Sequence, residues 1–267
     1  IWIDNLTGSY TGDTFVANSA YAMTGKSEYD AVSQIYINTQ NLATDFTYET
    51  LFRFNNLLQF RCFTNQITIL DISQSISLTD LRCFQNQIII LDVSLLVNLT
   101  FLQCHRNQII ILDVSTLTLL ALLQCFENQL SILDVSQLVN LINLQCYNNQ
   151  LSILDVSQLT QLTDLQCHGN LLTVLDTSQL VNLTKLYCYG NQLTALDISQ
   201  SVNLTDLRCF NNQFNNLVNS QILIDLDTNN LSNGFFQSSI FGGGTLTTAG
   251  LAAKNALLAK GWTIIGL

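Results

Sequence analysis

The chain has 267 residues, of which 48% are hydrophobic and 10% charged, with no proline and a formal net charge of -10 at pH 7. Nine Lys and Arg residues stand against nineteen Asp and Glu residues, so no basic stripe could neutralise a phosphate backbone, and nucleic acid is excluded as a partner. No apolar run reaches the roughly 20 residues that a helix needs to span a bilayer. Because the chain begins at Ile1 and its one methionine is Met23, we expect a leader or an upstream domain to be missing.

Residues 1–56 lack any internal period, and we interpret them as an N-terminal cap for the array that follows. They are rich in Thr, Ser, Asn, Asp and Tyr. We expect a strand over Ile35 to Asn38 and a short helix around Glu28 to Ser33, with Leu51 to Phe54 leading into the first repeat.

Residues 57–217 form an array in which a cysteine recurs every 21 residues. The unit reads L-x-x-L-x-C-x-x-N-Q-L-x-x-L-D-V-S-x-L-x-x and is seen cleanly in Leu141, Leu144, Cys146, Asn149 and Asp155. Alternating Leu, Leu and Cys predict a short strand with these side chains pointing inward. The asparagine three residues after each cysteine predicts a ladder of amides that bonds backbone groups of adjacent turns. These asparagines are Asn65, Asn86, Asn107, Asn128, Asn149, Asn170, Asn191 and Asn212.

Such a unit is a leucine-rich repeat, and the array resembles the short bacterial repeats in which the half-units L-x-x-L-x-C-x-x-N-Q and L-x-x-L-D-V-S-x-L-x-x alternate. Departures are few, such as Leu171 in place of Gln and Thr177 in place of Val. The resemblance implies a leucine-rich repeat solenoid of about eight repeats, with a parallel β-sheet on the concave face and short strands and helical turns opposite. It implies a cap at each end and no chemistry of its own.

An even number of cysteines favours disulfides, but the register argues against them. Equivalent residues on neighbouring strands lie about 4.8 Å apart with parallel Cα–Cβ vectors, whereas a bridge needs Cβ atoms about 3.8 Å apart. We therefore predict reduced thiols that act as small apolar fillers. No metal site and no cofactor are expected here, since there is no C-x-x-C pair and both histidines follow an inward cysteine.

A ring follows each cysteine, and strand alternation predicts that these rings face solvent along a track about 34 Å long. Arg61, Arg82 and Arg208 stand two residues before a ring and could donate paired hydrogen bonds to a ligand. Alternatively, the rings stabilise the sheet by stacking and bind nothing. The ring column is Phe63, Phe84, His105, Phe126, Tyr147, His168, Tyr189 and Phe210. A neighbouring outward column varies in kind and could encode specificity: Gln59, Asp80, Phe101, Leu122, Asn143, Asp164, Lys185 and Asp206.

Two more columns recur in the second half of the unit. An aspartate stands two residues before a serine in seven of the eight repeats, and calcium at Asp113, Asp134 and Asp155 would offset the repulsion between carboxylates. We favour the alternative, in which each aspartate accepts N–H groups of its own turn or bonds the serine. The other column is either buried or a lateral contact with a neighbouring subunit: Ile69, Ile90, Ile111, Ile132, Ile153, Val174 and Ala195.

Residues 218–267 are interpreted as a C-terminal cap. We expect Ser220 to cap a helix through Leu226, a turn at Gly242 to Gly244, a helix from Thr247 or Thr248 to Lys260 that Gly261 ends, and a strand over Trp262 to Ile265. The segment from Thr248 to Ile264 resembles the closing segment of surface-displayed leucine-rich proteins of the Bacteroidetes group and of structural proteins from phages that infect them. This resemblance implies an extracellular, cell-surface or virion-surface setting.

We expect no enzyme, because the acids recur identically in each turn, whereas a glycosidase needs two acids in different environments. The sequence instead predicts a recognition or adhesion module that binds a cell-surface ligand through the ring column, with a glycan as the first choice and a protein as the second. The alternative is a structural or assembly subunit of a virion or surface layer, held by protein–protein contacts.

Overall fold

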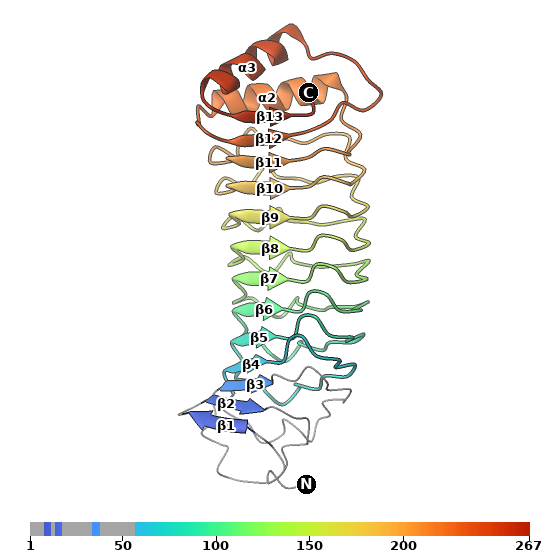
Figure 1. The fold of residues 1–267 in the computed structure, drawn as a ribbon, viewed down its shortest axis with the longest axis vertical. Helices are drawn as coiled ribbons and strands as arrows, with labels where there is room; N and C mark the ends of the chain where they lie inside the picture. The colour runs from blue at the N-terminus through green and yellow to red at the C-terminus, as the bar shows by residue number, and fades with distance from the viewer. Residues whose placement is uncertain (1–7, 12–13, 18–33, 38–56) are drawn as a thin grey trace. The chain divides into compact units, whose positions relative to one another are not determined.

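The computed structural model describes residues 8–11, 14–17, 34–37 and 57–267, and the chain divides into two compact units, residues 1–133 and 134–267. Within each unit, short strands stack as successive rungs of a β-solenoid (Figure 1). The helix expected around Glu28 to Ser33 and the segment Leu51 to Phe54 lie outside the described residues.

In unit 1, the antiparallel pair β1 and β2 is followed by parallel strands that pair in chain order. The strand expected at Ile35 to Asn38 is confirmed as β3. The strands are β1 (Gly8–Thr11), β2 (Thr14–Ala17), β3 (Gln34–Ile37), β4 (Gln59–Arg61), β5 (Asp80–Arg82), β6 (Phe101–Gln103) and β7 (Leu122–Gln124).

In unit 2, the parallel sheet continues past the last cysteine repeat, because β12 and β13 add two rungs that carry no cysteine. The terminal strand expected over Trp262 to Ile265 is confirmed as β13. The strands are β8 (Asn143–Gln145), β9 (Asp164–Gln166), β10 (Lys185–Tyr187), β11 (Asp206–Arg208), β12 (Phe235–Gln237) and β13 (Thr263–Ile265).

The core of each rung is built from the predicted inward residues. Leu141, Leu144 and Cys146 have no exposed surface, and the same positions are buried in the other repeats. All eight cysteines are buried free thiols, as predicted. Burial raises the pKa of Cys104 and of Cys167 to about 12, so these sulfurs remain protonated and pack as small apolar groups.

The predicted asparagine ladder is confirmed, and it links one rung to the next. The Nδ2 of Asn86 donates to the carbonyl of Cys83 in its own rung (3.0 Å) and to that of Cys62 in the preceding rung (2.9 Å). Its Oδ1 accepts the N–H of Ile67 at 3.1 Å. Each amide therefore satisfies buried backbone groups that the bend after the strand would leave unpaired.

Opposite the sheet, tight turns replace the helical turns that the resemblance implies. Ser75 N donates to Ile72 O at 2.9 Å and Leu78 N to Ser75 O at 3.0 Å, which closes two consecutive turns of i to i+3 type. The same pair of turns recurs in the following rungs. A 21-residue coil leaves too few residues on this side for a helix with i to i+4 bonds.

Helix α2 (Asn216–Thr228) begins earlier than expected. Its N-cap is Asn215, whose side chain accepts the N–H groups of Leu217 and Val218. The cap predicted at Ser220 is wrong, because this serine lies inside the helix, where its Oγ donates to the carbonyl of Asn216 at 2.6 Å. Asparagine is as good an N-cap residue as serine, and the sequence has several possible N-cap residues within one helical turn.

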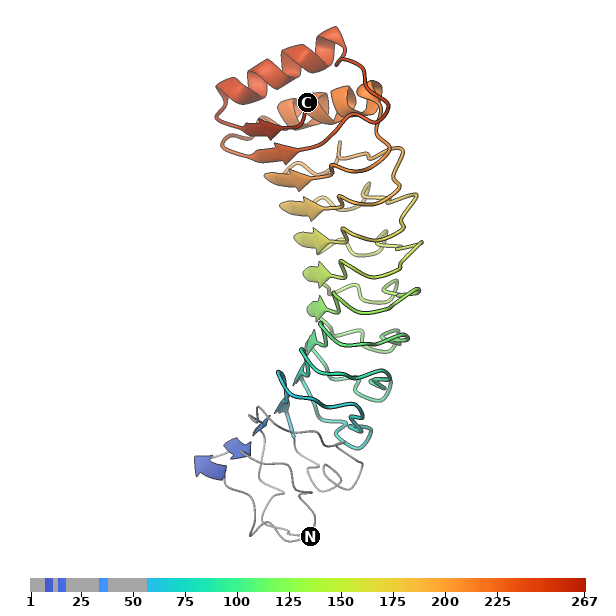
Figure 2. The ribbon, with the colours of Figure 1, turned by 45° about the vertical axis from the view of Figure 1, so that its right-hand side comes forward.

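Helix α3 (Thr248–Ala259) begins where predicted, with Thr247 as its N-cap, and ends one residue before the predicted Lys260, which is its C-cap. Gly261 follows in a left-handed conformation (φ 84°). It packs against α2 beyond β13, as Figures 1 and 2 show. A Cβ at Gly250 would lie 2.5 Å from the Cβ of Ser220, so only glycine permits this close crossing. Neither helix in the described part of the chain has the length and hydropathy of a membrane span.

Replacing Asn170 by Ala should destabilise the fold strongly. The change removes the donor to Cys146 O and Cys167 O and the acceptor for Leu151 N, and each buried group without a partner costs roughly 1–3 kcal/mol. We expect the midpoint of urea unfolding, measured by circular dichroism, to fall strongly. Gln150→Ala, which truncates an exposed amide in the same unit, is the control and should leave the midpoint unchanged. Equal midpoints for both variants would contradict the bridging role.

Candidate functional site

The ring column lies just beyond the strands, between each cysteine and a residue with positive φ. Residues 64, 85, 106, 127, 148 and 211 have φ between 51° and 59°, and Gly169 and Gly190 occupy the same position at 62° and 63°. The ring is therefore the last residue before a sharp bend. Because equivalent residues of successive rungs lie side by side, each ring meets the ring of the next rung.

In each unit the rings stack face to face. In unit 1 the centroid distances are 4.5 Å from Phe63 to Phe84, 4.5 Å from Phe84 to His105 and 4.0 Å from His105 to Phe126. In unit 2 they are 4.3 Å from Tyr147 to His168, 4.2 Å from His168 to Tyr189 and 4.5 Å from Tyr189 to Phe210. Interplanar angles stay between 3° and 18° in these pairs.

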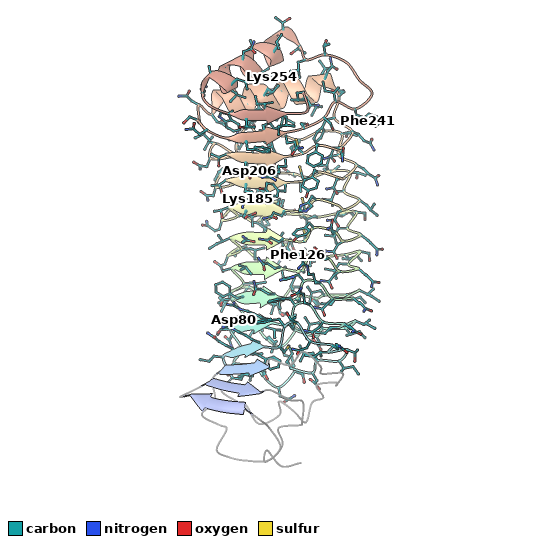
Figure 3. All side chains as sticks on the ribbon, in the orientation of Figure 1. Asp80, Phe126, Lys185, Asp206, Phe241 and Lys254 are labelled. Atoms are coloured by element: carbon teal, nitrogen blue, oxygen red, sulfur yellow. The ribbon has the colours of Figure 1, made fainter. Side chains whose placement is uncertain are left out.

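The prediction that the ring column is a solvent-facing track is wrong in its geometry. Phe126 is 7% exposed and His168 8%, and the other six rings are partly buried. Strands about 4.8 Å apart hold flat rings at nearly their contact distance, so each ring covers the face of its neighbour. A sugar that stacks on a ring needs a ring face, and the faces between the stacked rings of each unit are occupied. The Phe126 label in Figure 3 marks the column beside the sheet.

The two histidines are members of these stacks and do not point freely outward. Burial lowers the pKa of His105 and of His168 to about 4, so both imidazoles are neutral at pH 7. The Nδ1 of each is buried and makes no hydrogen bond within the described residues. The same residues contain no group of three His, Cys, Asp or Glu side chains that could hold a metal ion.

The outward residues of the strands form a polar and aromatic surface, which we call the sheet face. In unit 2 its centre is Arg208, whose guanidinium lies 4.4 Å from the ring centroid of Tyr187 and 4.8 Å from that of Phe235. Its Nε donates to Asp206 at 3.2 Å, and its side chain is 38% exposed. Arg208 is thus held between two rings with part of its charge open to solvent.

A second set of bonds extends this arrangement across neighbouring strands. Tyr187 donates its hydroxyl to Asp206 at 2.5 Å, and burial together with this bond raises the pKa of Tyr187 to about 12. Lys185 pairs with Asp164 at 3.1 Å, and Gln166 donates to the same carboxylate at 3.0 Å. Lys185 and Asp206 are labelled on this face in Figure 3. The network fixes the orientation of side chains that remain partly exposed.

The sheet face of unit 1 carries a smaller ion-pair cluster next to an apolar area. Asp80 is buried and accepts from Arg61 at 3.1 Å and from Arg82 at 2.9 Å. Phe101, on the next strand, is 42% exposed. Two of the three arginines predicted to bind a ligand are therefore bonded to one carboxylate, and Arg208 has a corresponding partner in unit 2.

The aspartates of the second half-unit close turns, as we favoured. Asp113 Oδ1 accepts the N–H of Ser115 at 3.0 Å and its hydroxyl at 2.7 Å, and the other members of the column accept the equivalent N–H at 2.9 or 3.0 Å. These bonds lower the pKa of Asp113 and of Asp155. Stable turns account for these aspartates without a metal ion, and calcium at Asp113, Asp134 and Asp155 stays an untested prediction.

Phe235 and Gln237 belong to the sheet face but were missed by sequence reasoning, because β12 follows helix α2 and carries neither the cysteine nor the leucine pattern. The only available signal was the triplet Phe-Phe-Gln, which has the outward, inward, outward order of Asp-Leu-Arg in β11.

Comparison with solved structures finds leucine-rich repeat proteins, and the fold of this chain is a leucine-rich repeat solenoid. The functional domain of InlJ from Listeria monocytogenes, which includes a cysteine ladder, is 26% identical with a TM-score of 0.59; the match covers 82% of this chain and 57% of that one. This chain thus spans little more than half the length of that relative. No protein-family model and no curated protein matches the sequence.

Two further structures show the same fold. The internalin inlF from Listeria monocytogenes is 17% identical with a TM-score of 0.62, and the match covers 94% of this chain and 86% of that one. The plant peptide hormone receptor RGFR1, in complex with RGF2, is 19% identical with a TM-score of 0.65, over 79% of this chain and 41% of the receptor. Bacterial internalins and a plant peptide hormone receptor are thus among the structural neighbours.

The two stacked histidines should make the fold sensitive to acid. Their pKa is about 4 in the folded chain and 6.5 ordinarily, so the unfolded chain binds more protons between these values. Stability is then complete above about pH 6.5 and falls as the pH drops toward 4. We expect the urea midpoint to fall over this range in the native chain and to stay flatter in His105→Phe/His168→Phe, which keeps the rings. Parallel pH profiles would show that the imidazoles are not buried in the stacks.

Proposed function

We propose that this chain is a non-enzymatic extracellular recognition module that binds a protein or peptide ligand through the sheet face of unit 2. One observation carries the proposal: Arg208 is fixed between Tyr187 and Phe235 while its side chain remains 38% exposed. Oriented Arg and Tyr side chains are the residues that most often dominate protein interfaces. A folded core does not require such a cluster on an open face.

The surroundings of Arg208 suit a polypeptide better than a sugar. Lys185 and Asp164 place both signs of charge beside the aromatic pair, so the face offers donors, acceptors and apolar surface within a few strands. The ring column, which would have served a glycan, has its ring faces covered. The structural neighbours support this choice, since one is a peptide hormone receptor bound to its ligand and others are internalins.

The setting of the module is also proposed. Internalins and receptors among the neighbours support display outside the cell. We also include a virion surface among the proposed settings. The reason is that the segment from Thr248 to Ile264 resembles closing segments of Bacteroidetes surface proteins and of phage structural proteins.

Selection of peptides on the immobilised full chain tests the proposed site. A phage-displayed peptide library is panned, and the affinity of the best peptide is measured by isothermal titration for the native chain and for Arg208→Ala. We expect Arg208→Ala to weaken binding at least tenfold, because it removes the oriented cation at the centre of the face. The urea midpoint of each variant shows that the fold is retained.

Arg106→Ala is the matched control, since Arg106 pairs with Glu127 and lies outside the sheet face. It should bind the peptide as the native chain does. Equal affinity of Arg208→Ala and the native chain would overturn the proposed site. Saturable binding in a glycan array, with no enriched peptide, would overturn the ligand class.

A further inference from the structure

Unit 1 carries an exposed apolar column on the side away from the sheet face, which we call the isoleucine stripe. It consists of Ile69, Ile90, Ile111 and Ile132, which are 54%, 76%, 75% and 76% exposed. The sequence allowed either a buried column or a lateral contact, and the structure shows that the stripe is not buried. An apolar surface repeated in four rungs is costly in water unless a partner covers it.

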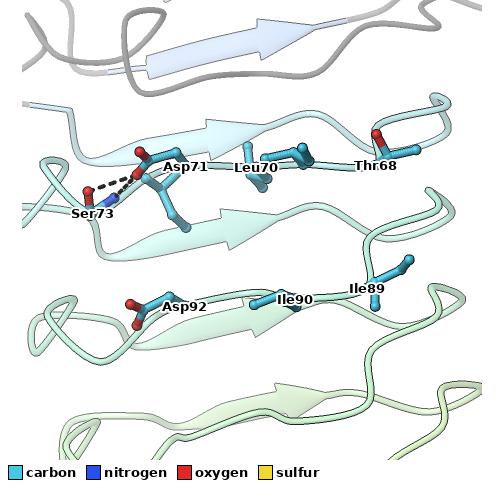
Figure 4. A pocket seen from close by; sticks show the side chains of 9 residues that line it. Thr68, Leu70, Asp71, Ser73, Ile89, Ile90 and Asp92 are labelled. Carbon is cyan, nitrogen blue, oxygen red and sulfur yellow. Dashed lines mark hydrogen bonds between the residues drawn. The ribbon is translucent and has the colours of Figure 1, made fainter.

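In two of its four rungs, a second exposed isoleucine widens the stripe, whereas the equivalent residues of the other two rungs are Thr68 and Ser131. Ile89 and Ile110, 44% and 48% exposed, stand beside it. The equivalent positions in unit 2 are Ser152, Thr173 and Thr194, and the column there consists of Ile153, which is 76% exposed, followed by Val174 and Ala195. A hollow of about 760 Å³ lies between the rungs that contain β4 and β5 (Figure 4). It is lined by Ile69, Ile89 and Ile90 and bordered by Asp71 and Asp92.

An acidic row runs parallel to the stripe. Asp71, Asp92 and Asp113 stand two residues after the isoleucines, and Ile90 and Ile111 form a parallel bridge, so the backbone there is extended and the row lies about 7 Å from the stripe. Bonds from the following serines lower the pKa of Asp92 and Asp113, which keeps both charged.

No ion pair reaches these aspartates within the described residues. The arginines that the structure describes in unit 1, Arg61, Arg82 and Arg106, pair with Asp80 and Glu127 instead. Among the described residues, the stripe is therefore an apolar ridge bordered by aspartates that no Lys or Arg pairs with. A complementary partner must bring aliphatic side chains together with Lys or Arg.

We propose that the isoleucine stripe is the docking surface for a cationic amphipathic α-helix of a partner protein, lying along the stripe. Four rungs span about 14 Å, close to the roughly 16 Å of three helical turns at 5.4 Å per turn. Aliphatic residues at i, i+4 and i+7 then meet successive isoleucines, and Lys or Arg on one flank reach the aspartates.

Other occupants fit less well. A strand along the same axis presents a side chain on one face only every 6.6–6.8 Å or so, which falls out of step with rungs about 4.8 Å apart. A second copy would bring a second acidic row, and the chain has only nine Lys and Arg residues against nineteen acids. An anionic membrane surface is repelled by the same border.

Fluorescence anisotropy with a designed probe tests the proposal on the full chain. The probe is an 18-residue labelled helix with Leu at i, i+3, i+4 and i+7 and Lys on both flanks, and its counterpart carries Glu in place of Lys. We expect the Lys peptide to bind at least tenfold more tightly than the Glu peptide. Two variants should each weaken the Lys peptide at least tenfold: Ile90→Thr/Ile111→Thr, which removes apolar surface, and Asp92→Asn/Asp113→Asn, which removes charge but keeps an Oδ1 to accept the serine N–H.

Val97→Thr is the matched control, because Val97 is 48% exposed in the same unit but lies outside the stripe. It should bind as the native chain does, and so should Arg208→Ala, which separates this surface from the proposed recognition site. Equal binding of both peptides, no binding of either, or an equal loss in Val97→Thr would overturn the proposal. Self-association in sedimentation velocity that Ile90→Thr/Ile111→Thr abolishes would assign the stripe to a second copy instead.

Discussion

The structure depends on a buried amide that joins consecutive rungs. In each repeat an asparagine follows the bend after the strand. Within a unit, its Nδ2 donates to the cysteine carbonyl of its own rung and to that of the preceding rung, and its Oδ1 accepts a backbone N–H. A coil that bends this sharply would otherwise leave buried carbonyls unpaired. Because the same bonds recur at each step, they hold the rungs at a constant spacing and in register, and residues 21 positions apart fall into columns.

Columns at a constant spacing have different consequences for different side chains. Flat rings held at about 4.8 Å stack and hide their faces, so the ring column becomes part of the stabilising core. Aspartates at the same spacing are each held by their own turn. Columns whose residues change from rung to rung cannot stack in this way, and the sheet face, where Asp164, Lys185 and Asp206 follow one another, is left partly open for recognition.

The repeat itself could be predicted because period 21 and the inward residues Leu144, Cys146 and Asn149 each have a direct structural cause. The exposure of the rings could not, since strand alternation was applied two residues past the strand end, directly before a residue in the left-handed conformation. Rung β12 was missed because a 13-residue helix interrupts the period before Phe235. The ion pairs on the sheet face depend on side-chain conformations across neighbouring strands, which no periodicity specifies.

The central claim is that the ring column stabilises the fold and the sheet face binds. The most direct measurement compares Tyr189→Leu with the native chain for both properties, because Tyr189 stacks between His168 and Phe210 and is not part of the proposed site. We expect Tyr189→Leu to have a lower urea midpoint and an unchanged affinity for a peptide selected on the native chain. An unchanged midpoint with lost binding would contradict it and return the ring column to the role of a ligand site.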